Sequence, residues 1–181
     1  KILNNVNSGQ IAIGNADLKS AGDIDLATLT NADIDAQANA KTYGLAGAAQ
    51  GVSVANVSVD NDVLIQSGAR LTAKGNISLM AGQNRVGDIN QYAISARTDL
   101  WNKTALPIAT VPQADGTLNQ TNTVTIAAGA WVGSAGDVNL LTEMGEITVI
   151  GKGVGKDLYR EALETVANAV GGNASLEING G

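Results

Sequence analysis

Hydrophobic and polar residues alternate in several short stretches of the chain, and these stretches recur. The heptad SAGDIDL at 20–26 returns as AKGNISL at 73–79 and as SAGDVNL at 134–140. In each copy a glycine and an Asp or Asn precede alternating apolar and polar residues. A period of two residues is typical of a strand with one face buried and one exposed. The pattern therefore predicts short strands separated by tight corners.

A longer repeat unit surrounds each heptad. Its marker isoleucines are Ile13, Ile65, Ile126 and Ile178, which lie 52, 61 and 52 residues apart by subtraction of their positions. We predict one domain over 1–181, with repeat units at about 10–61, 62–122 and 123–174 and a partial unit at 175–181. If each unit makes three turns of a solenoid, one turn takes roughly 17–20 residues.

The repeat predicts an all-β fold, a right-handed parallel β-helix (β-solenoid) with loop excursions and one short flanking α-helix. Equivalent apolar residues should then stack in columns that fill a narrow core. The predicted columns are Ile13/Ile65/Ile126, Leu18/Leu71/Val132, Ile24/Ile77/Val138 and Leu26/Leu79/Leu140. Gly22, Gly75 and Gly136 are predicted turn residues, because glycine accepts backbone conformations that are forbidden to residues with a Cβ.

Three variable segments separate the repeating parts. Residues 36–62 are rich in Ala and Gly and then alternate, whereas 96–122 contains both prolines and is interpreted as a loop or edge excursion. In the third segment, apolar residues recur at helical spacing before Gly171. This predicts a short amphipathic helix at about 156–170, packed on the flank.

Composition excludes several classes of function. The chain has no His and no Cys, which removes histidine-based acid/base catalysis, thiolate metal sites and disulfides. The net charge is −6 and the 11 basic residues are scattered, so we expect no nucleic-acid binding. No apolar run approaches the roughly 20 residues that cross a bilayer, so we expect no membrane insertion. The chain starts at Lys1 within a repeating pattern, and we expect it to be a segment of a longer protein.

The repeat resembles a known family. The residues Val63–Ala81, VLIQSGARLTAKGNISLMA, are similar to the repeats of filamentous-haemagglutinin-like large exoproteins. The segment YGLAGAAQGVSVANVSV at 43–59 is similar to inter-repeat segments of leukotoxin-type filamentous adhesins. The resemblance implies a secreted, surface-associated Gram-negative fibre that is exported by an outer-membrane partner (two-partner secretion). The amino-terminal secretion module of that family is not found in this sequence.

Carboxylates are the first candidate site. Asp17, Asp23, Asp25, Asp33 and Asp35 alternate, so several should face outward on one wall. Such a wall could carry the paired carboxylates of a polysaccharide lyase or hydrolase. It could equally be a solvated strand face whose charges prevent edge-to-edge aggregation, which is the interpretation we favour. We predict no cofactor and no dedicated metal site. An incidental Ca²⁺ would contact Asp23, Asp25, Asp60 or Asp62.

Aromatic residues are the second candidate site. Trp131 occupies the repeat position held by Asp17 and Arg70 and should point outward. It could stack on a sugar, but we expect it to be covered by the segment that carries Trp101 or by another subunit. Trp131, Trp101 and Tyr159 are the candidate residues for ligand or partner contact.

These inferences favour a non-enzymatic, structural role. We expect a rigid adhesive stalk at the bacterial surface, extracellular, that mediates attachment, biofilm formation or self-association into end-to-end or lateral filaments. A host-surface or matrix glycan or protein is the expected external partner. The alternative is a β-helix polysaccharide lyase or hydrolase that uses its outward-facing carboxylates.

Overall fold

The described part of the molecule is built of parallel sheets. The computed structural model describes residues 1–157. Its strands are β1 (Ile2–Ile13), β2 (Asp17–Ser20), β3 (Ile24–Thr28), β4 (Asn31–Ile65), β5 (Arg70–Ala73), β6 (Ile77–Ala81), β7 (Gln91–Ile126), β8 (Trp131–Ser134), β9 (Val138–Thr142) and β10 (Glu146–Asp157). No helix occurs among these residues. The predicted all-β class is therefore confirmed.

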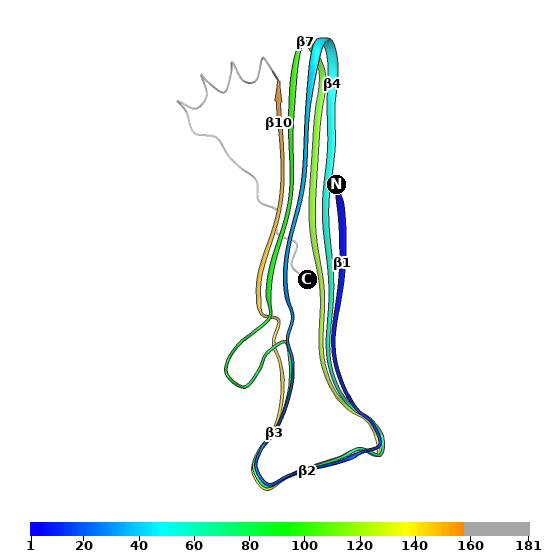
Figure 1. Ribbon diagram of the computed structural model, residues 1–181, viewed down its shortest axis with the longest axis vertical. Helices are drawn as coiled ribbons and strands as arrows, with labels where there is room; N and C mark the ends of the chain where they lie inside the picture. The colour runs from blue at the N-terminus through cyan, green and yellow to red at the C-terminus, as the bar shows by residue number, and fades with distance from the viewer. Residues whose placement is uncertain (158–181) are drawn as a thin grey trace.

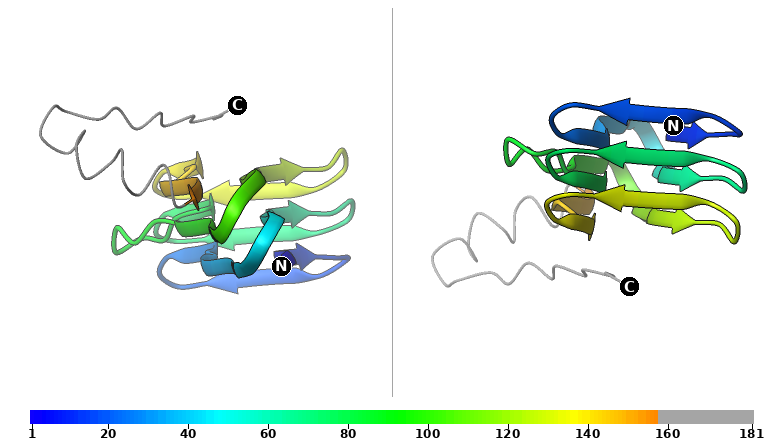
Figure 2. Two further views of the ribbon diagram at one scale, coloured as in Figure 1. Left: turned by 90° about the horizontal axis from the view of Figure 1, so that it is seen from above. Right: turned by 90° about the horizontal axis from the view of Figure 1, so that it is seen from below.

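The sheets take their strands in a repeating order. One sheet has the order β1-β4-β7-β10, a second has β2-β5-β8 and a third has β3-β6-β9. Every pairing between these strands is parallel. The chain thus passes through the three sheets in turn and then begins again one layer further on, as Figures 1 and 2 show.

The predicted apolar columns are confirmed by the strand register. Leu18, Leu71 and Val132 are successive partners in one sheet, and Leu26, Leu79 and Leu140 in another. The columns headed by Ile13 and Ile24 are also in register. Together they form the core of the base, the three-sided end of the molecule in Figure 1. Aliphatic side chains of similar size fill this narrow space, which explains the absence of Phe.

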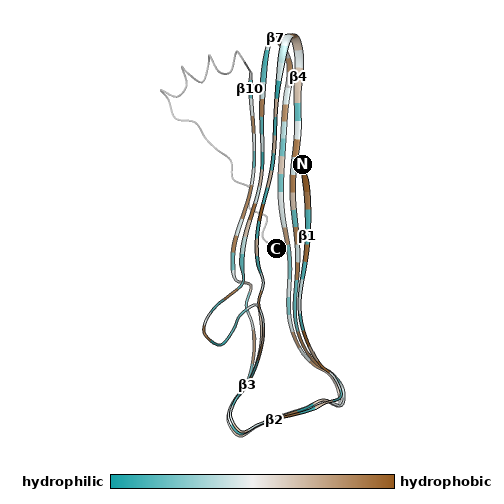
Figure 3. Cartoon of the chain, viewed as in Figure 1, coloured by the Kyte–Doolittle hydropathy of each residue, from teal (hydrophilic) through white to brown (hydrophobic). Residues whose placement is uncertain are grey.

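The first sheet extends far beyond the base as a long arm. Its long strands fold over at the arm tip, where Gly44 has a φ of 145°. The outbound wall comprises 31–44 of β4, 91–104 of β7 and β10. The return wall comprises β1, 46–65 of β4 and 106–126 of β7. Figure 3 shows hydrophilic and hydrophobic segments alternating along both walls.

Small residues let the two walls approach closely. A Cβ on Gly51 would lie 2.7 Å from Leu100 Cδ2, and one on Gly151 would lie 2.6 Å from the carbonyl oxygen of Ala114. Ala36 and Ala55 are fully buried. Sheets that pack through larger side chains lie about 10 Å apart. The Ala and Gly content of this part of the sequence therefore serves the packing of a thin arm.

Two predictions about the variable segments are corrected. Residues 96–122 are not a loop but belong to β7, which pairs with β4 along nearly its whole length. Pro112 is tolerated because the return half of β7 has no further partner strand within 1–157, and sheets admit proline at an edge. The predicted helix at 156–170 lies outside the described residues, except for 156–157, which end β10.

The predicted turn length is also wrong. Ile13, Ile65 and Ile126 are direct register partners, so one circuit of the chain takes a whole repeat unit. The circuit is long because it includes both walls of the arm. A one-dimensional period cannot distinguish three short turns from one long turn.

The core columns lead to a first prediction. Leu79→Ala should lower the free energy of unfolding by about 2–5 kcal/mol, because Leu79 is fully buried and its loss leaves a cavity. Leu140→Ala is the matched control, since Leu140 occupies the same column but is 52% exposed. We expect a clearly smaller loss there. Urea unfolding followed by circular dichroism measures both, and equal losses would contradict the proposed core.

Candidate functional site

The recurring Gly-Asp/Asn corner is a ladder that joins successive circuits. The backbone N–H of Asn76 donates to Asp23 Oδ1 at 2.8 Å, and the N–H of Asp137 donates to Asn76 Oδ1 at 2.9 Å. Each side chain thus satisfies a backbone donor in the next circuit, and either a carboxylate or an amide can accept. This explains why Asp and Asn exchange at the position.

The glycines of this corner have a different role from the predicted one. Gly22, Gly75 and Gly136 lie between strands, but none has a positive φ. Instead, a Cβ on Gly75 would collide with Asp23 Oδ1 and lie 2.9 Å from the backbone carbon of Gly22. A Cβ on Gly136 would collide with Asn76 Oδ1 in the same way. Gly75 and Gly136 therefore make room for the ladder, whereas Gly22 has open space around it. Positive φ angles occur at other corners instead, among them Gly68, Gly129 and Gly145.

This distinction gives a second prediction. Gly75→Ala should destabilise the fold by about 1–3 kcal/mol, because backbone atoms must shift to admit the methyl group. Gly22→Ala should be neutral or slightly stabilising, because no atom lies within 4 Å of its Cβ position. Thermal or urea unfolding of the two variants provides the comparison. If both variants lose stability equally, backbone conformation rather than space governs these positions.

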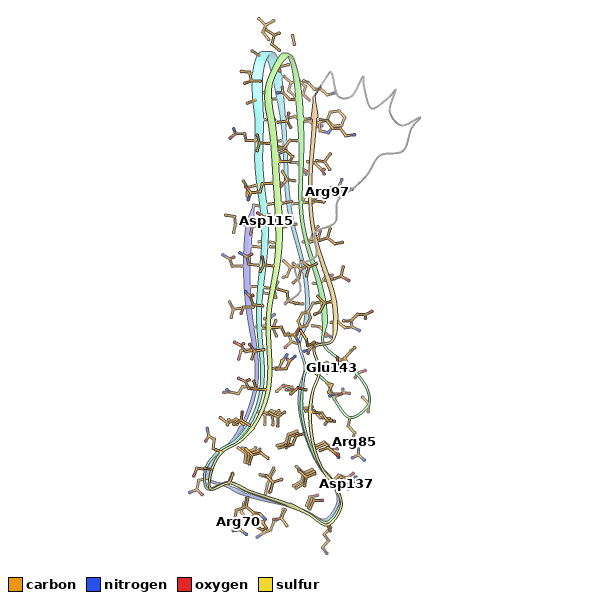
Figure 4. All side chains as sticks on the ribbon, turned by 180° about the vertical axis from the view of Figure 1, so that it is seen from behind. Arg70, Arg85, Arg97, Asp115, Asp137 and Glu143 are labelled. Atoms are coloured by element: carbon orange, nitrogen blue, oxygen red, sulfur yellow. The ribbon has the colours of Figure 1, made fainter. Side chains whose placement is uncertain are left out.

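An inserted loop places an arginine on the acidic wall. Residues 82–90 connect β6 to β7, and Arg85 Nη1 contacts Asp23 Oδ2 at 2.6 Å and Asp25 Oδ2 at 2.9 Å. Asn84 orders the loop by accepting from the backbone N–H groups of Val86 and Asp88. Figure 4 shows Arg85 at the same corner of the base as Asp137. Sequence spacing could not reveal this contact, because about sixty residues separate the partners.

The electrostatics of Asp23 follow from these contacts. The hydrogen bond from the Asn76 N–H, together with Arg85, holds the pKa of Asp23 below its ordinary value of 3.8. The same carboxylates raise the pKa of Arg85. Arg85 thus pairs with both carboxylates and joins the loop to the wall.

The other metal candidates do not lie together with these residues. Asp60 and Asp62 are on the return half of β4, and Asp62 accepts a hydrogen bond from Thr123 in the next circuit. Within residues 1–157, no group of three or more Asp, Glu, His or Cys side chains is arranged to hold a metal ion.

The ladder gives a third prediction, on pH. Because the folded-state pKa of Asp23 is depressed, its contribution is present above pH 3.8 and is lost as the pH falls through the folded-state pKa. Asp23→Asn keeps the acceptor oxygen but removes the charge. Its unfolding midpoint in urea should therefore fall less than that of the wild type between about pH 5 and pH 2.

Asp137→Asn is the control for this experiment. Asp137 lies in the same column, but within 1–157 its carboxylate binds neither an arginine nor a backbone N–H. We expect the pH dependence of this variant to stay close to that of the wild type. If Asp23→Asn and wild type have parallel pH profiles, the carboxylate does not stabilise the fold through its charge.

Trp131 lies on the outside of the base. It follows Asp17 and Arg70 in register and is 55% exposed, with the Arg70 guanidinium 5.6 Å from its ring centroid. The segment that carries Trp101 does not cover it, because Trp101 belongs to the outbound wall of the arm. The expected covering by that segment is therefore wrong. Among the described residues, Trp131 lies beside Arg70 and over Gly133, and about half of its surface remains exposed.

Trp101 lies at the centre of a lysine cluster. Lys41 and Lys156 are its register partners on either side, and both ammonium groups lie 5.8 Å from the ring centroid. Lys103 lies 4.7 Å from the same centroid. These are cation–π distances. An open groove of about 380 Å³ adjoins the ring, lined by Asn39, Ala40, Lys41, Asp99 and Trp101. We call Trp101, Lys41, Lys103 and Lys156 the lysine–tryptophan cluster.

A buried amide cluster joins the base to the arm. Asn61 Nδ2 donates to Asn122 Oδ1 at 3.0 Å, and Thr30 donates to Asn61 Oδ1 at 2.7 Å and, through its backbone N–H, to Asn90 Oδ1 at 2.8 Å. Burial raises the pKa of nearby Tyr92, while Asn61 opposes this shift. Buried amides need such partners, so the cluster fixes where the chain leaves the base.

Sequence reasoning missed most of these groupings. It singled out Trp101 but not Lys41 and Lys156, which come from the neighbouring circuits, nor Lys103, which lies two residues further along the same strand. It did not identify Arg85 as the partner of Asp23 and Asp25, although Arg85 binds both. Tyr159, the remaining contact candidate, lies outside the described residues.

Comparisons of the chain with protein-family models, curated proteins and solved structures gave no match.

Proposed function

We propose that the chain is a right-handed parallel β-helix segment of a secreted bacterial surface filament, of the filamentous-haemagglutinin-like kind. The observation that supports this most directly is the parallel register between circuits in all three sheets, which between β4 and β7 shifts by one residue at Gly47/Ala48, near the arm tip. In such an arrangement each circuit is a template for the next, so length and stiffness grow with the number of repeats. The role is a stalk that displays adhesive surfaces outside the cell.

The hydrogen-bond ladder at the Gly-Asp/Asn corner can be continued by a further circuit. Asp23 and Asn76 each accept a backbone N–H from the following circuit. Asp137 is exposed and holds the equivalent position at the last described corner. The apolar residues of that circuit, including Val138 and Leu140, are partly exposed. A further circuit or a second copy would cover them and continue both the ladder and the columns.

The arm supplies surface for attachment. It projects from a compact base, as Figure 1 shows, and displays Trp101 with its lysines. A rigid scaffold that holds projecting recognition elements is a common arrangement in binding proteins. In this proposal the chain works without a catalytic centre or cofactor, and its partners are further copies of the filament and molecules of a host surface or matrix.

Self-association provides the fourth prediction. Purified chain should form elongated particles that lengthen with protein concentration, because exposed column residues of one copy can be covered by another. Leu140→Lys should leave single copies, since a charge would then be buried at the junction. Electron microscopy and sedimentation velocity measure particle length and mass.

Val86→Lys is the matched control, because Val86 is exposed in the 82–90 loop and lies outside the columns. It should assemble like the wild type. Circular dichroism should show that all three proteins keep the same strand content. Wild-type protein that stays a single copy at every concentration would count against a filament-forming role.

A further inference from the structure

The tip of the arm exposes a concentrated group of large apolar side chains. Tyr43, Leu45, Leu106 and Ile108 are between 66% and 83% exposed. Tyr43 and Leu45 lie where β4 folds over, and Leu106 lies beside them in register, opposite Ala46. We call these four residues the apolar tip. Exposed apolar groups gathered at one projecting point usually mark a contact surface.

The lysine–tryptophan cluster lies directly behind the apolar tip. Trp101 is three residues before Thr104, the partner of Gly44 at the fold-over, and Lys103 is closer still. At about 3.3 Å per residue, the ring lies about 10 Å behind the end of the arm. The protein as a whole carries a net charge of −6, so the positive lysine side chains near the arm tip have the opposite sign to the chain as a whole.

Lys41 and Lys103 carry positive charge that the structure describes beside the ring. Asp99 lines the adjoining groove, but its carboxylate pairs with Arg97 Nε at 2.7 Å. Asp33 and Glu146 lie at the opposite, lower end of the outbound wall, close to the base. Lys41 and Lys103 therefore place two positive charges beside an aromatic ring, with apolar side chains beyond it.

We propose that the arm tip binds the surface of a lipid bilayer that contains anionic headgroups, with the apolar tip entering the interface. Charge complementarity identifies the partner, because lysines are attracted to anionic lipids and tryptophan settles at headgroup level. The distance from Trp101 to the arm tip also agrees with the usual insertion depth, because interfacial segments bury their apolar side chains about 5–10 Å into the boundary between headgroups and acyl chains. With Trp101 at the headgroups, the tip reaches this depth.

The arrangement favours a bilayer over a soluble acidic polysaccharide. A sugar chain would use Trp101 and the lysines, but it would leave Leu45, Leu106 and Ile108 in water. Within residues 1–157 no helix could span a bilayer. The expectation of no membrane insertion rested on the lack of a spanning run, whereas a peripheral contact needs only side chains at one end. This proposal is independent of filament formation.

The fifth prediction tests both halves of the surface with vesicles. Wild-type chain should co-sediment with vesicles of phosphatidylcholine and phosphatidylglycerol and bind vesicles of phosphatidylcholine alone far more weakly. Lys41→Gln/Lys103→Gln should lower the partition coefficient roughly 25-fold, at about fivefold for each lysine near an anionic surface. Leu45→Ser/Ile108→Ser should lower it at least about tenfold.

The base supplies matched controls for these variants. Lys19→Gln/Lys74→Gln removes the same charge from exposed positions on the base, and Val86→Ser removes an apolar side chain as exposed as Leu45. Both should bind vesicles like the wild type. All of the substituted side chains are exposed, so we expect unchanged strand content, which circular dichroism verifies. Equal losses in tip and base variants would overturn the proposal.

Tryptophan fluorescence gives a second readout. The chain has two tryptophans, so Trp131→Phe leaves Trp101 as the sole reporter and Trp101→Phe leaves Trp131. Anionic vesicles should shift the Trp101 emission to the blue and leave that of Trp131 unchanged. Dextran sulfate, a soluble polyanion, should cause no comparable shift. An equal shift with dextran sulfate, together with full binding by Leu45→Ser/Ile108→Ser, would assign the surface to polyanions and overturn the lipid proposal.

Discussion

Backbone hydrogen bonding between successive parallel strands, kept in one register, is the constraint on which the rest of this structure depends. In the base each residue lies against its equivalent in the neighbouring circuit, as with Leu18, Leu71 and Val132. A shift by one residue would turn every column side chain to the opposite face. Register therefore decides which residues are buried, and apolar and polar residues alternate along the strands because successive side chains point to opposite faces.

The same register explains how polar residues are accommodated at the corners and inside the molecule. Asp23 and Asn76 accept backbone N–H groups from the circuits that follow them. Asn61 donates to Asn122, its partner one circuit on. In both cases a glycine one circuit away leaves the space: Gly75 for Asp23, and Gly9 for Asn61. The polar groups within each ladder satisfy one another's hydrogen-bonding capacity. The ladders therefore stabilise the strand register, and their polar groups do not destabilise the interior.

Departures from the repeat are tolerated only where they avoid the columns. The 82–90 loop leaves between β6 and β7, and its Arg85 returns to the outside of the base. The arm leaves from the buried amide cluster and packs on itself through Gly and Ala. Because the arm has its own interior, its outer face and tip are free to carry Trp101, lysines and apolar side chains. This separation of scaffold from contact surface supports the proposed stalk and the proposed lipid contact alike.

The sequence by itself determined the strands of the base, the four apolar columns and the all-β class. Alternation and repetition can be recognised in the sequence, and parallel register then places the equivalent residues in contact. Only the tertiary structure decided that one circuit takes a whole repeat unit and that 96–122 is strand. Each wall of the arm packs against the other wall, as Gly51 does against Leu100, and periodicity does not encode which segments face each other. The role of Gly75 and the gathering of Lys41, Lys103 and Lys156 around Trp101 were likewise decided in three dimensions. The Gly75 contact and the placement of Lys41 and Lys156 depend on atoms that only the stacking of circuits brings together, whereas Lys103 lies two residues from Trp101 along the same strand.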